Sequence, residues 1–420
     1  MISPPAATTS AHVAAVRAAR DSYARLLSWL AYQWRDVAAA EDALATALTK
    51  ALEHWPAQGI PNAPDAWLLS VAKRELLQIA RHQRLHDSPE VQALLEGEGV
   101  AEELPTIPDA RLKLLFVCAH PAIDATVRPA LMLQTVLGLD ANVVAQAMLA
   151  SPAAMAQRLV RAKQKIRDAR LKFEEPSDAE LPERLHAVLE AIYAAYGLGW
   201  DAMQAGDVDE SHGAHQEELR GEALYLGELV CTLLPNEPEA KGLLALMLFC
   251  ESRSDARFDS EGGFVPLAAQ DTERWNREAI VQAEALLRAA AAHQSVGTFQ
   301  LEAAIQSAHC QRLFTGETPW LAVAKLYEQL IECAPSLGAQ IAHAVALAQA
   351  GEVSGAQKLL HALDHPRLAS YQPYWVARAH LAALAGNVKE AAESFDRAIG
   401  LTSAPTTRDY LRKQRASLLA

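Results

Sequence analysis

Two places in this chain combine residue types that could do chemistry. Cys118 and His120, in the stretch FVCAHPAI, could form a thiol–imidazole pair. Residues two positions apart do not face each other on a helix, however, and no activating partner is evident. His212 and His215, in DESHGAHQEE, have the spacing of metal ligands, but no third or fourth ligand can be identified. We therefore predict no enzyme, no metal site and no cofactor.

A basic helix is predicted over residues 151–167, SPAAMAQRLVRAKQKIR. Ser151 suits the N-cap and Pro152 the first helical position. Apolar residues recur at spacings of 4, 3 and 4, which predicts one buried face. These apolar residues are Met155, Leu159, Ala162 and Ile166. The cations of the stretch, which contains no acidic residue, are Arg158, Arg161, Lys163, Lys165 and Arg167.

A shorter helix, ANVVAQAML, precedes this basic helix and is separated from it by a break at residues 150–152. Two short helices joined by a tight turn are typical of a helix-turn-helix. Its second helix enters the major groove of DNA while cations hold the phosphates. The alternative is an ordinary amphipathic helix whose solvated face is basic. The turn residues favour the DNA-binding interpretation.

The elements that position these residues are predicted to be helical almost throughout. Alanine and leucine dominate, and hairpin signals are nearly absent, which indicates an all-α fold. No apolar run reaches the roughly 18 residues that span a bilayer, and no secretory leader is recognisable, so we expect a cytoplasmic protein without membrane contact. The 5 scattered cysteines include no CxxC pair, which argues against a zinc knuckle or a disulfide framework.

Charge is distributed unevenly along the chain, whose formal net charge is −13. Residues 1–170 contain 18 Lys and Arg against 17 Asp and Glu, whereas the remaining residues contain 20 against 34. An acidic domain repels phosphate. We therefore expect any nucleic-acid contact to come from the N-terminal part.

Composition predicts three helical parts. A first domain, residues 11–86, is bent where three prolines and a glycine interrupt HWPAQGIPNAPDAW. A polar, acidic linker over 87–110 leads to a second domain, 111–173, and a longer helical domain occupies 176–420. In that last domain QDTERWNREAI predicts a helix start with Asp271 as N-cap and Trp275 buried, with a ligand site as the alternative.

An internal repeat lies near the C-terminus. LAQAGEVSGAQKLL and LAALAGNVKEAAESF align with Gly351 over Gly386, Val353 over Val388, and Ala356 over Ala391, a period of 35. Helix pairs of about 34 residues are the period of tetratricopeptide (TPR) arrays, whose small residues let neighbouring helices pack closely. The repeat favours a TPR-like interaction domain.

The chain also resembles a known family over nearly its whole length. The second domain is similar to the −35-reading domain of extracytoplasmic-function sigma factors, in the subgroup with a long TPR-like C-terminal extension. The resemblance rests on MAQRLVRAKQKIR followed by LPERLHAVLEAIYAAY, on RLKLLFVCAHPAI, and on LLPNEPEAKGLLALML, QDTERWNREAI and FQLEAAIQSAHC further on. The first domain resembles the −10-binding domain through AEDAL, ALEHWPAQGIPNAPDAWLLSVA and the segment that follows.

The resemblance implies a sigma factor that binds core RNA polymerase and directs it to promoter DNA. It implies polymerase contacts for Glu41, Asp42 and Leu44. It implies −10 contacts for Trp67, Lys73, Arg74, Arg81 and Arg84, although Trp67 could equally be a core residue. It implies −35 contacts for Ala154, Gln157, Arg158, Arg161, Lys163 and Lys165. The C-terminal extension would regulate the DNA-binding half, by docking on it or through a protein partner.

The chain departs from the subgroup pattern at polymerase-facing and promoter-facing positions. Ala45, Thr46 and Leu48 replace a usual Gln-Glu pair and a Phe, and Val143 and Val144 replace a usual Glu-Ile. In the −10 helix, an Asn-Arg pair and a later Asp give way to Arg74, Glu75 and Gln78. These differences keep a second interpretation open, a helical-repeat scaffold whose sigma-like half no longer recruits polymerase.

Overall fold

The computed structural model describes the backbone of residues 23, 25–82, 111–136, 139–148, 150–171, 176–177, 179–205 and 210–418. It also describes their side chains, apart from those of 80–82, 143, 146–147, 198 and 201–219. The chain divides into two compact units, Met1–Ala195 (unit 1) and Tyr196–Ala420 (unit 2). The predicted linker over 87–110 lies outside the described residues.

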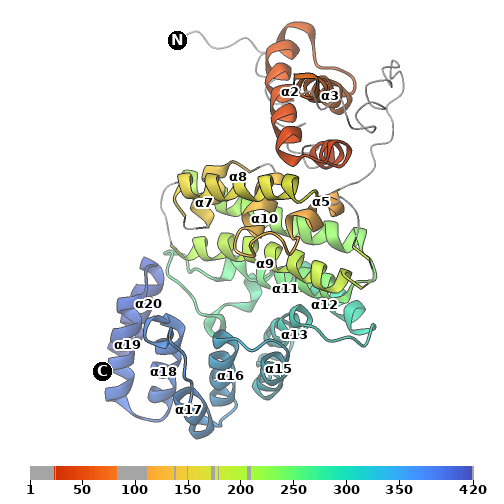
Figure 1. Ribbon diagram of the computed structural model, residues 1–420. Helices are drawn as coiled ribbons and strands as arrows, with labels where there is room; N and C mark the ends of the chain where they lie inside the picture. Colours follow the sequence, from red (N-terminus) through yellow and green to blue (C-terminus); the bar gives the residue numbers. More distant parts are fainter. Residues whose placement is uncertain are drawn as a thin grey trace, which may run out of the picture. The chain divides into compact units, whose positions relative to one another are not determined.

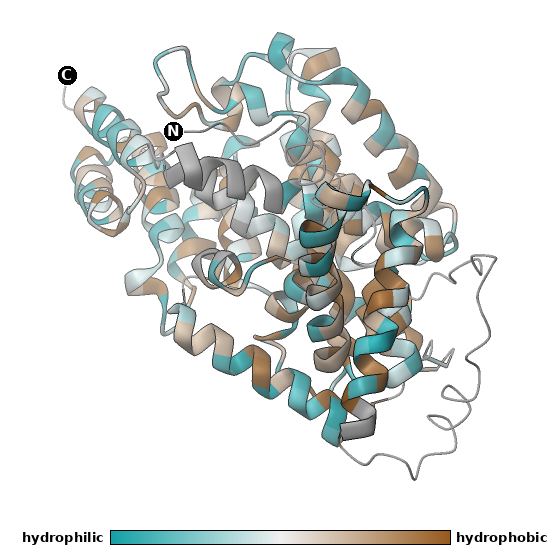
Figure 2. Ribbon diagram, turned by 90° about the horizontal axis from the view of Figure 1, so that it is seen from above, coloured by the Kyte–Doolittle hydropathy of each residue, from teal (hydrophilic) through white to brown (hydrophobic). Residues whose placement is uncertain are grey.

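Both units are built from helices, as composition predicted (Figure 1). Within the described ranges no strand forms, and the one β-bridge pairs Phe258 with Phe264. Apolar and polar residues fall on different sides of many helices, so that each buries one face (Figure 2). In the described part of unit 1, residues 25–34 are helical. The helices that follow are α2 (Val37–Gln58), α3 (Pro64–His82), α5 (Arg111–Cys118), α6 (Arg128–Thr135), α7 (Ala141–Ala147), α8 (Pro152–Asp168) and the first part of α9 (Leu181–Ala205).

The helices of unit 2 continue from the end of α9. They are α10 (Glu210–Leu233), α11 (Pro238–Glu251), α12 (Arg277–Ala291), α13 (Thr298–Cys310), α14 (Arg312–Thr315), α15 (Trp320–Cys333), α16 (Leu337–Gln349), α17 (Val353–His361), α18 (Gln372–Leu384), α19 (Val388–Leu401) and α20 (Pro405–Ser417). Four short 3-10 turns join them, η1 (Ser254–Ala256), η2 (Leu267–Ala269), η3 (Thr272–Arg274) and η4 (Leu368–Ser370).

The predicted bend of the first domain separates α2 from α3. Pro56 is accommodated inside the last turn of α2, and the helix ends at Gly59, whose φ of 85° favours glycine. The Gly59 N–H donates to the carbonyl of Trp55 at 3.0 Å. Across the bend Trp55 and Trp67 pack edge to face, with ring centroids 5.6 Å apart. The turn therefore closes a helix pair around an aromatic contact.

The chain divides into its two compact units after Ala195, within α9. The start of a C-terminal domain at residue 176 stays a prediction. The first part of α9 belongs with unit 1 because its buried side chains include Leu185, at 3% exposure. The Arg184 guanidinium also donates to the carbonyl of Phe116 at 2.7 Å. The first part of α9 therefore packs with the helices of unit 1.

The core of unit 2 is organised by α11, which is buried on nearly every side and contacts α10, α12 and α13. Gly242 lets α11 approach α13 closely, since a Cβ there would lie 2.7 Å from the backbone nitrogen of Gln300. Glu239 of α11 caps the start of α13 by accepting from the N–H groups of Phe299 and Gln300, each at 3.0 Å. The acidic side chain replaces the local cap that Gly297 cannot supply.

The repeated sequences form two equivalent helix pairs, α16–α17 and α18–α19. Gly351 and Gly386 follow the first helix of each pair with φ of 98° and 75°, and Ala356 and Ala391 are fully buried on the second helices. The 35-residue period of the sequence therefore recurs in the structure. In each copy a glycine at positive φ ends the first helix and a buried alanine lies on the second.

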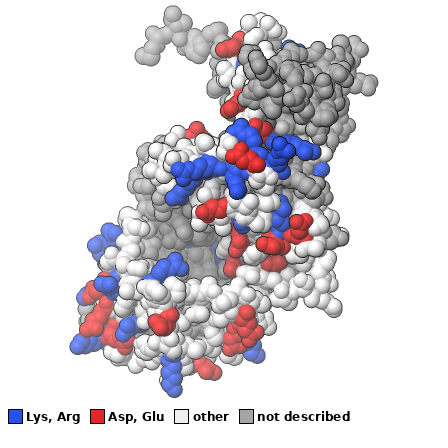
Figure 3. Space-filling model, viewed as in Figure 1, with Lys and Arg blue, Asp and Glu red and all other residues white. Residues whose placement is uncertain are grey.

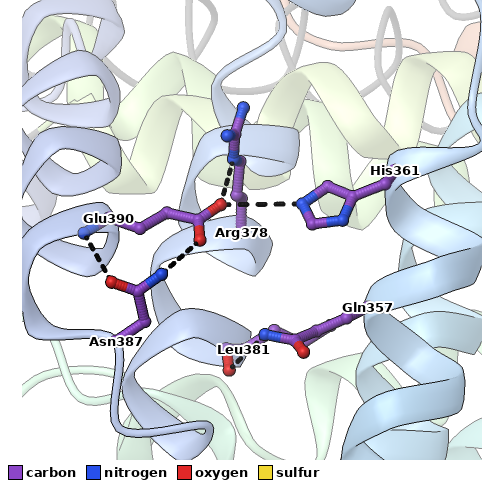
Figure 4. A network of polar contacts seen from close by, with 6 residues as sticks. All are labelled: Gln357, His361, Arg378, Leu381, Asn387 and Glu390. Atoms are coloured by element: carbon purple, nitrogen blue, oxygen red, sulfur yellow. Dashed lines mark hydrogen bonds and ion pairs between the residues drawn. The ribbon is translucent and has the colours of Figure 1, made fainter.

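Glu390 joins the second helices of the two pairs (Figure 4). Its Oε1 lies 3.0 Å from Arg378 Nε and 3.6 Å from His361 Nε2. Its Oε2 accepts from the Asn387 amide at 2.8 Å, while Asn387 Oδ1 accepts from the Glu390 N–H at 3.3 Å. The Asn387 side chain therefore caps the start of α19, and the Glu390 carboxylate holds the Asn387 amide in place.

The segment between α11 and α12 is irregular, and hydrogen bonds from Arg312 to its backbone hold it in place. Arg312 donates to the carbonyls of Leu267 and Ala268, at 3.0 and 2.5 Å. Trp275 is 4% exposed, as predicted, but Asp271 caps only the 3-10 turn that follows it. The N-cap of α12 is Asn276, whose side chain accepts from Ala279 N at 3.1 Å, which corrects the predicted cap. The residues that the sequence pattern assigned to the start of α12 form the 3-10 turn η3 instead, so the helix begins later.

Candidate nucleic-acid interface

Local sequence positions α8 as predicted. The Ser151 hydroxyl accepts from Ala154 N at 3.3 Å, and Pro152 opens the helix. The predicted apolar face is buried, with exposures of 1–7% for Met155, Leu159, Ala162 and Ile166. α7 precedes α8 and packs against it. A short helix packed against the start of a longer basic helix is therefore present.

The side of α8 next to its buried face carries an exposed row of charge. Gln157, Arg158, Arg161 and Lys165 are exposed, and Ala154 is half-buried in the first turn. Figure 3 shows Lys and Arg side chains gathered over α8. Since the row follows the helix at spacings of three and four residues, all three cations can face one surface.

A hollow of about 380 Å³ lies beside this row. Arg158, Arg161 and Lys165 line one side of it, and the loop that precedes α6 lines the other through Asp124 and Thr126. The Asp124 carboxylate accepts from the Thr126 N–H at 2.8 Å and from its hydroxyl at 2.7 Å. These hydrogen bonds, helped by Arg158 and Arg128, lower the pKa of Asp124. Three cations against one carboxylate leave the hollow suited to an anion.

Sequence reasoning missed the residues of this loop. The signal was present as an Asp two positions before a Thr, a spacing at which the Asp side chain accepts from the backbone and closes a turn. What the sequence lacked was any sign that this turn lies against α8.

Lys163 points away from the exposed row. Its ammonium forms an ion pair with Glu41 of α2, and the two side chains are only 11% and 15% exposed. A second contact of the same helices joins Arg167 Nη1 to Asp36 Oδ2 at 3.2 Å. Burial raises the pKa of Glu41, and Lys163 opposes that rise. A residue expected to contact DNA and one expected to contact polymerase are thus bonded to each other.

The other two residues assigned to polymerase contact differ in exposure to solvent. Asp42 is exposed, one position along α2 from Glu41. Leu44 is 1% exposed and packs in the core of unit 1, so it supports the helix rather than its surface. Among the departures from the family pattern, Ala45 is exposed and Glu75 forms an ion pair with Lys50.

The residues assigned to the −10 element lie on α3. Trp67 is half-buried against Trp55, Lys73 lies 4.4 Å above the Trp29 ring, and Arg74 is exposed. Burial lowers the pKa of Lys73. The side chain of Arg81 and the whole of Arg84 lie outside the described residues. Among the described members, Arg74 is exposed, and its guanidinium donates to the Ser70 hydroxyl at 3.3 Å.

Cys118 and His120, which were weighed for chemistry, each form a hydrogen bond in the structure, but not with each other. The buried Cys118 thiol lies 3.1 Å from the Thr135 hydroxyl, and burial raises the pKa of the thiol to about 12. His120 instead accepts from Ala122 N at 3.1 Å. The side chains of His212 and His215 lie outside the described residues. Within the described ranges, no cluster of three or more His, Cys, Asp or Glu is arranged to hold a metal ion. None of the described helices carries an apolar stretch that could cross a membrane.

Comparisons with known proteins place the chain among relatives. Residues 184–291 match a family described as a family of unknown function (DUF6596). The uncharacterized protein R00370 of Rhizobium meliloti (strain 1021) is 34% identical over 394 residues, which cover 92% of each chain. No solved structure matches. At this identity over nearly the full length of both chains, the protein belongs to the same family as protein R00370 of Rhizobium meliloti.

Proposed function

We propose that the protein is an alternative sigma factor of the extracytoplasmic-function type. In this proposal unit 1 binds core RNA polymerase and promoter DNA, and unit 2 is a TPR-like regulatory domain that takes a protein partner. The observation that carries the proposal furthest is the exposed row Arg158, Arg161 and Lys165 on the second helix of a short helix pair. This arrangement suits phosphate contacts beside a recognition helix.

The excess of acidic residues in unit 2 fits a protein in which only unit 1 contacts DNA. Most of the chain repels DNA, whereas one helix face attracts it, which limits non-specific binding. The Glu41–Lys163 pair adds a condition, because any use of Glu41 by polymerase or of Lys163 by DNA requires that pair to separate. Asp42 and the exposed row are accessible without that change.

The DNA-binding half of the proposal predicts a strong salt-dependent effect. Changing Arg158, Arg161 and Lys165 together to alanine should weaken binding to a mixed-sequence duplex by about 100-fold at about 0.15 M salt. The slope of log affinity against log salt should fall by about 3, because three phosphate contacts are lost. Fluorescence anisotropy of a labelled duplex titrated with the full-length protein measures both quantities.

The matched control removes three exposed cations of unit 2, Arg277, Lys358 and Lys389. This variant carries the same change in net charge and should bind DNA nearly as the unmodified protein does. Equal losses in both triple variants would mean that net charge, rather than the α8 row, determines DNA binding.

The polymerase-binding half predicts saturable binding of labelled full-length protein to purified core RNA polymerase. Asp42→Ala should weaken that binding about tenfold, because it removes an exposed charge at a close interface contact. Glu53→Ala, at another exposed acid of α2, is the control and should leave affinity within about twofold. A full-length protein that binds no polymerase would contradict the proposal and favour the helical-repeat scaffold.

A further inference from the structure

Unit 2 contains a cavity of about 560 Å³ that the proposed function does not use. Its wall is formed by residues of α13, α15, α16, α18 and α20, together with Phe264 and Pro266 of the irregular segment after α11. Aromatic rings make up much of the lining, including Trp320, Tyr327, Tyr371 and Tyr410. The volume lies within the range of pockets that enclose a single drug-sized molecule.

None of the described residues that line the cavity carries a charge at neutral pH. Burial, with Arg253 and Arg312 nearby, lowers the pKa of His309 to about 4. Burial also lowers the pKa of His380 and raises that of Tyr327 to about 12. A charged ligand would lose its hydration here without gaining an opposite charge from the wall, which is costly. The cavity therefore selects against ions.

We propose that unit 2 binds one uncharged, ring-containing, mainly apolar small molecule in this cavity. The aromatic lining supplies the contact area, and the absence of charge among the described lining residues supplies selectivity. The site is independent of the surfaces assigned to DNA and polymerase, which lie on unit 1.

Two probes that differ by a single charged group test this proposal on the full-length protein. N-phenylnaphthylamine is uncharged, and anilinonaphthalenesulfonate is the same ring system with a sulfonate. The uncharged probe should bind saturably at one site, at least about tenfold tighter than its sulfonated analogue. Its emission should be sensitised by energy transfer from Trp320, which lines the cavity.

Two variants locate the bound probe. Ala342→Trp places an indole ring inside the cavity and should abolish saturable binding, whereas Val281→Trp, at a position 61% exposed on α12, should not. Trp320→Phe keeps the shape of the wall, so binding should persist while sensitised emission falls in part. Equal affinity for the two probes, or saturable binding unaffected by Ala342→Trp in a folded protein, would overturn the proposal.

Discussion

Replacing Lys163 by methionine should destabilise unit 1 by about 3 kcal/mol at neutral pH, because it leaves a buried carboxylate without its partner. Glu41 is only 15% exposed, and its pKa is already raised by burial despite the ion pair. Urea unfolding, with hydrogen exchange of the α2 and α8 peptides to assign the transition to unit 1, measures the loss.

The stability that Lys163→Met loses relative to the unmodified protein should depend on pH in a defined direction. Without Lys163 the folded-state pKa of Glu41 rises further above its ordinary value of 4.5. Between these two pKa values the folded state holds a proton that the unfolded state has lost, so stability falls as pH rises. The deficit should therefore be largest at neutral pH and shrink as pH is lowered toward 4.5.

Two further variants separate loss of the partner from loss of any lysine. Lys165→Met, on the exposed side of α8, should change stability by no more than about 0.5 kcal/mol. The double variant Glu41→Met with Lys163→Met should recover most of the loss, since well-packed apolar residues often replace a buried ion pair without cost. A single Lys163→Met variant as stable as the unmodified protein would show that α2 and α8 do not share a buried pair.

Phe249→Ala should lower the free energy of unfolding of unit 2 by about 3–5 kcal/mol. Phe249 is fully buried on α11, the helix that contacts α10, α12 and α13. Truncation removes the apolar contacts and leaves a cavity that a helix fixed on several sides cannot close. Urea unfolding of the full-length protein, followed by hydrogen exchange of the α11 and α13 peptides, measures the change.

Phe314→Ala is the matched control, because the same side chain is 65% exposed there. Its loss should stay within about 0.5 kcal/mol. Similar losses for the two phenylalanines would place α11 at the surface and contradict its central position in unit 2.

Much of the secondary structure followed from the sequence, because helix signals are local. Ser151, Pro152 and the buried positions of α8 act within a few residues of each other, so spacing alone predicted the helix, its start and its buried face. The repeat at Gly351 and Gly386 was also local, since a glycine at positive φ ends one helix and positions the next. These features need no knowledge of distant contacts.

The candidate site was only partly determined in this way. Periodicity shows which residues of a helix share a face, but not which other helix that face meets. Lys163 lies on the same basic helix as Arg158, yet it pairs with Glu41, more than a hundred residues earlier in the sequence. Leu44 shares a motif with Asp42, yet one is in the core and the other in solvent. Packing between distant segments decided the accessibility of each residue.

The sequence by itself therefore determined the helical fold, the start and apolar face of α8, its basic row and the two repeated helix pairs. The tertiary structure alone decided the Glu41–Lys163 pair, the hollow beside α8, the end of unit 1 within α9 and the uncharged cavity of unit 2. The physical reason is the range of the interactions. Capping, turn geometry and helical periodicity act over a few residues, whereas burial, ion pairing and cavities arise where residues far apart in the chain are packed together.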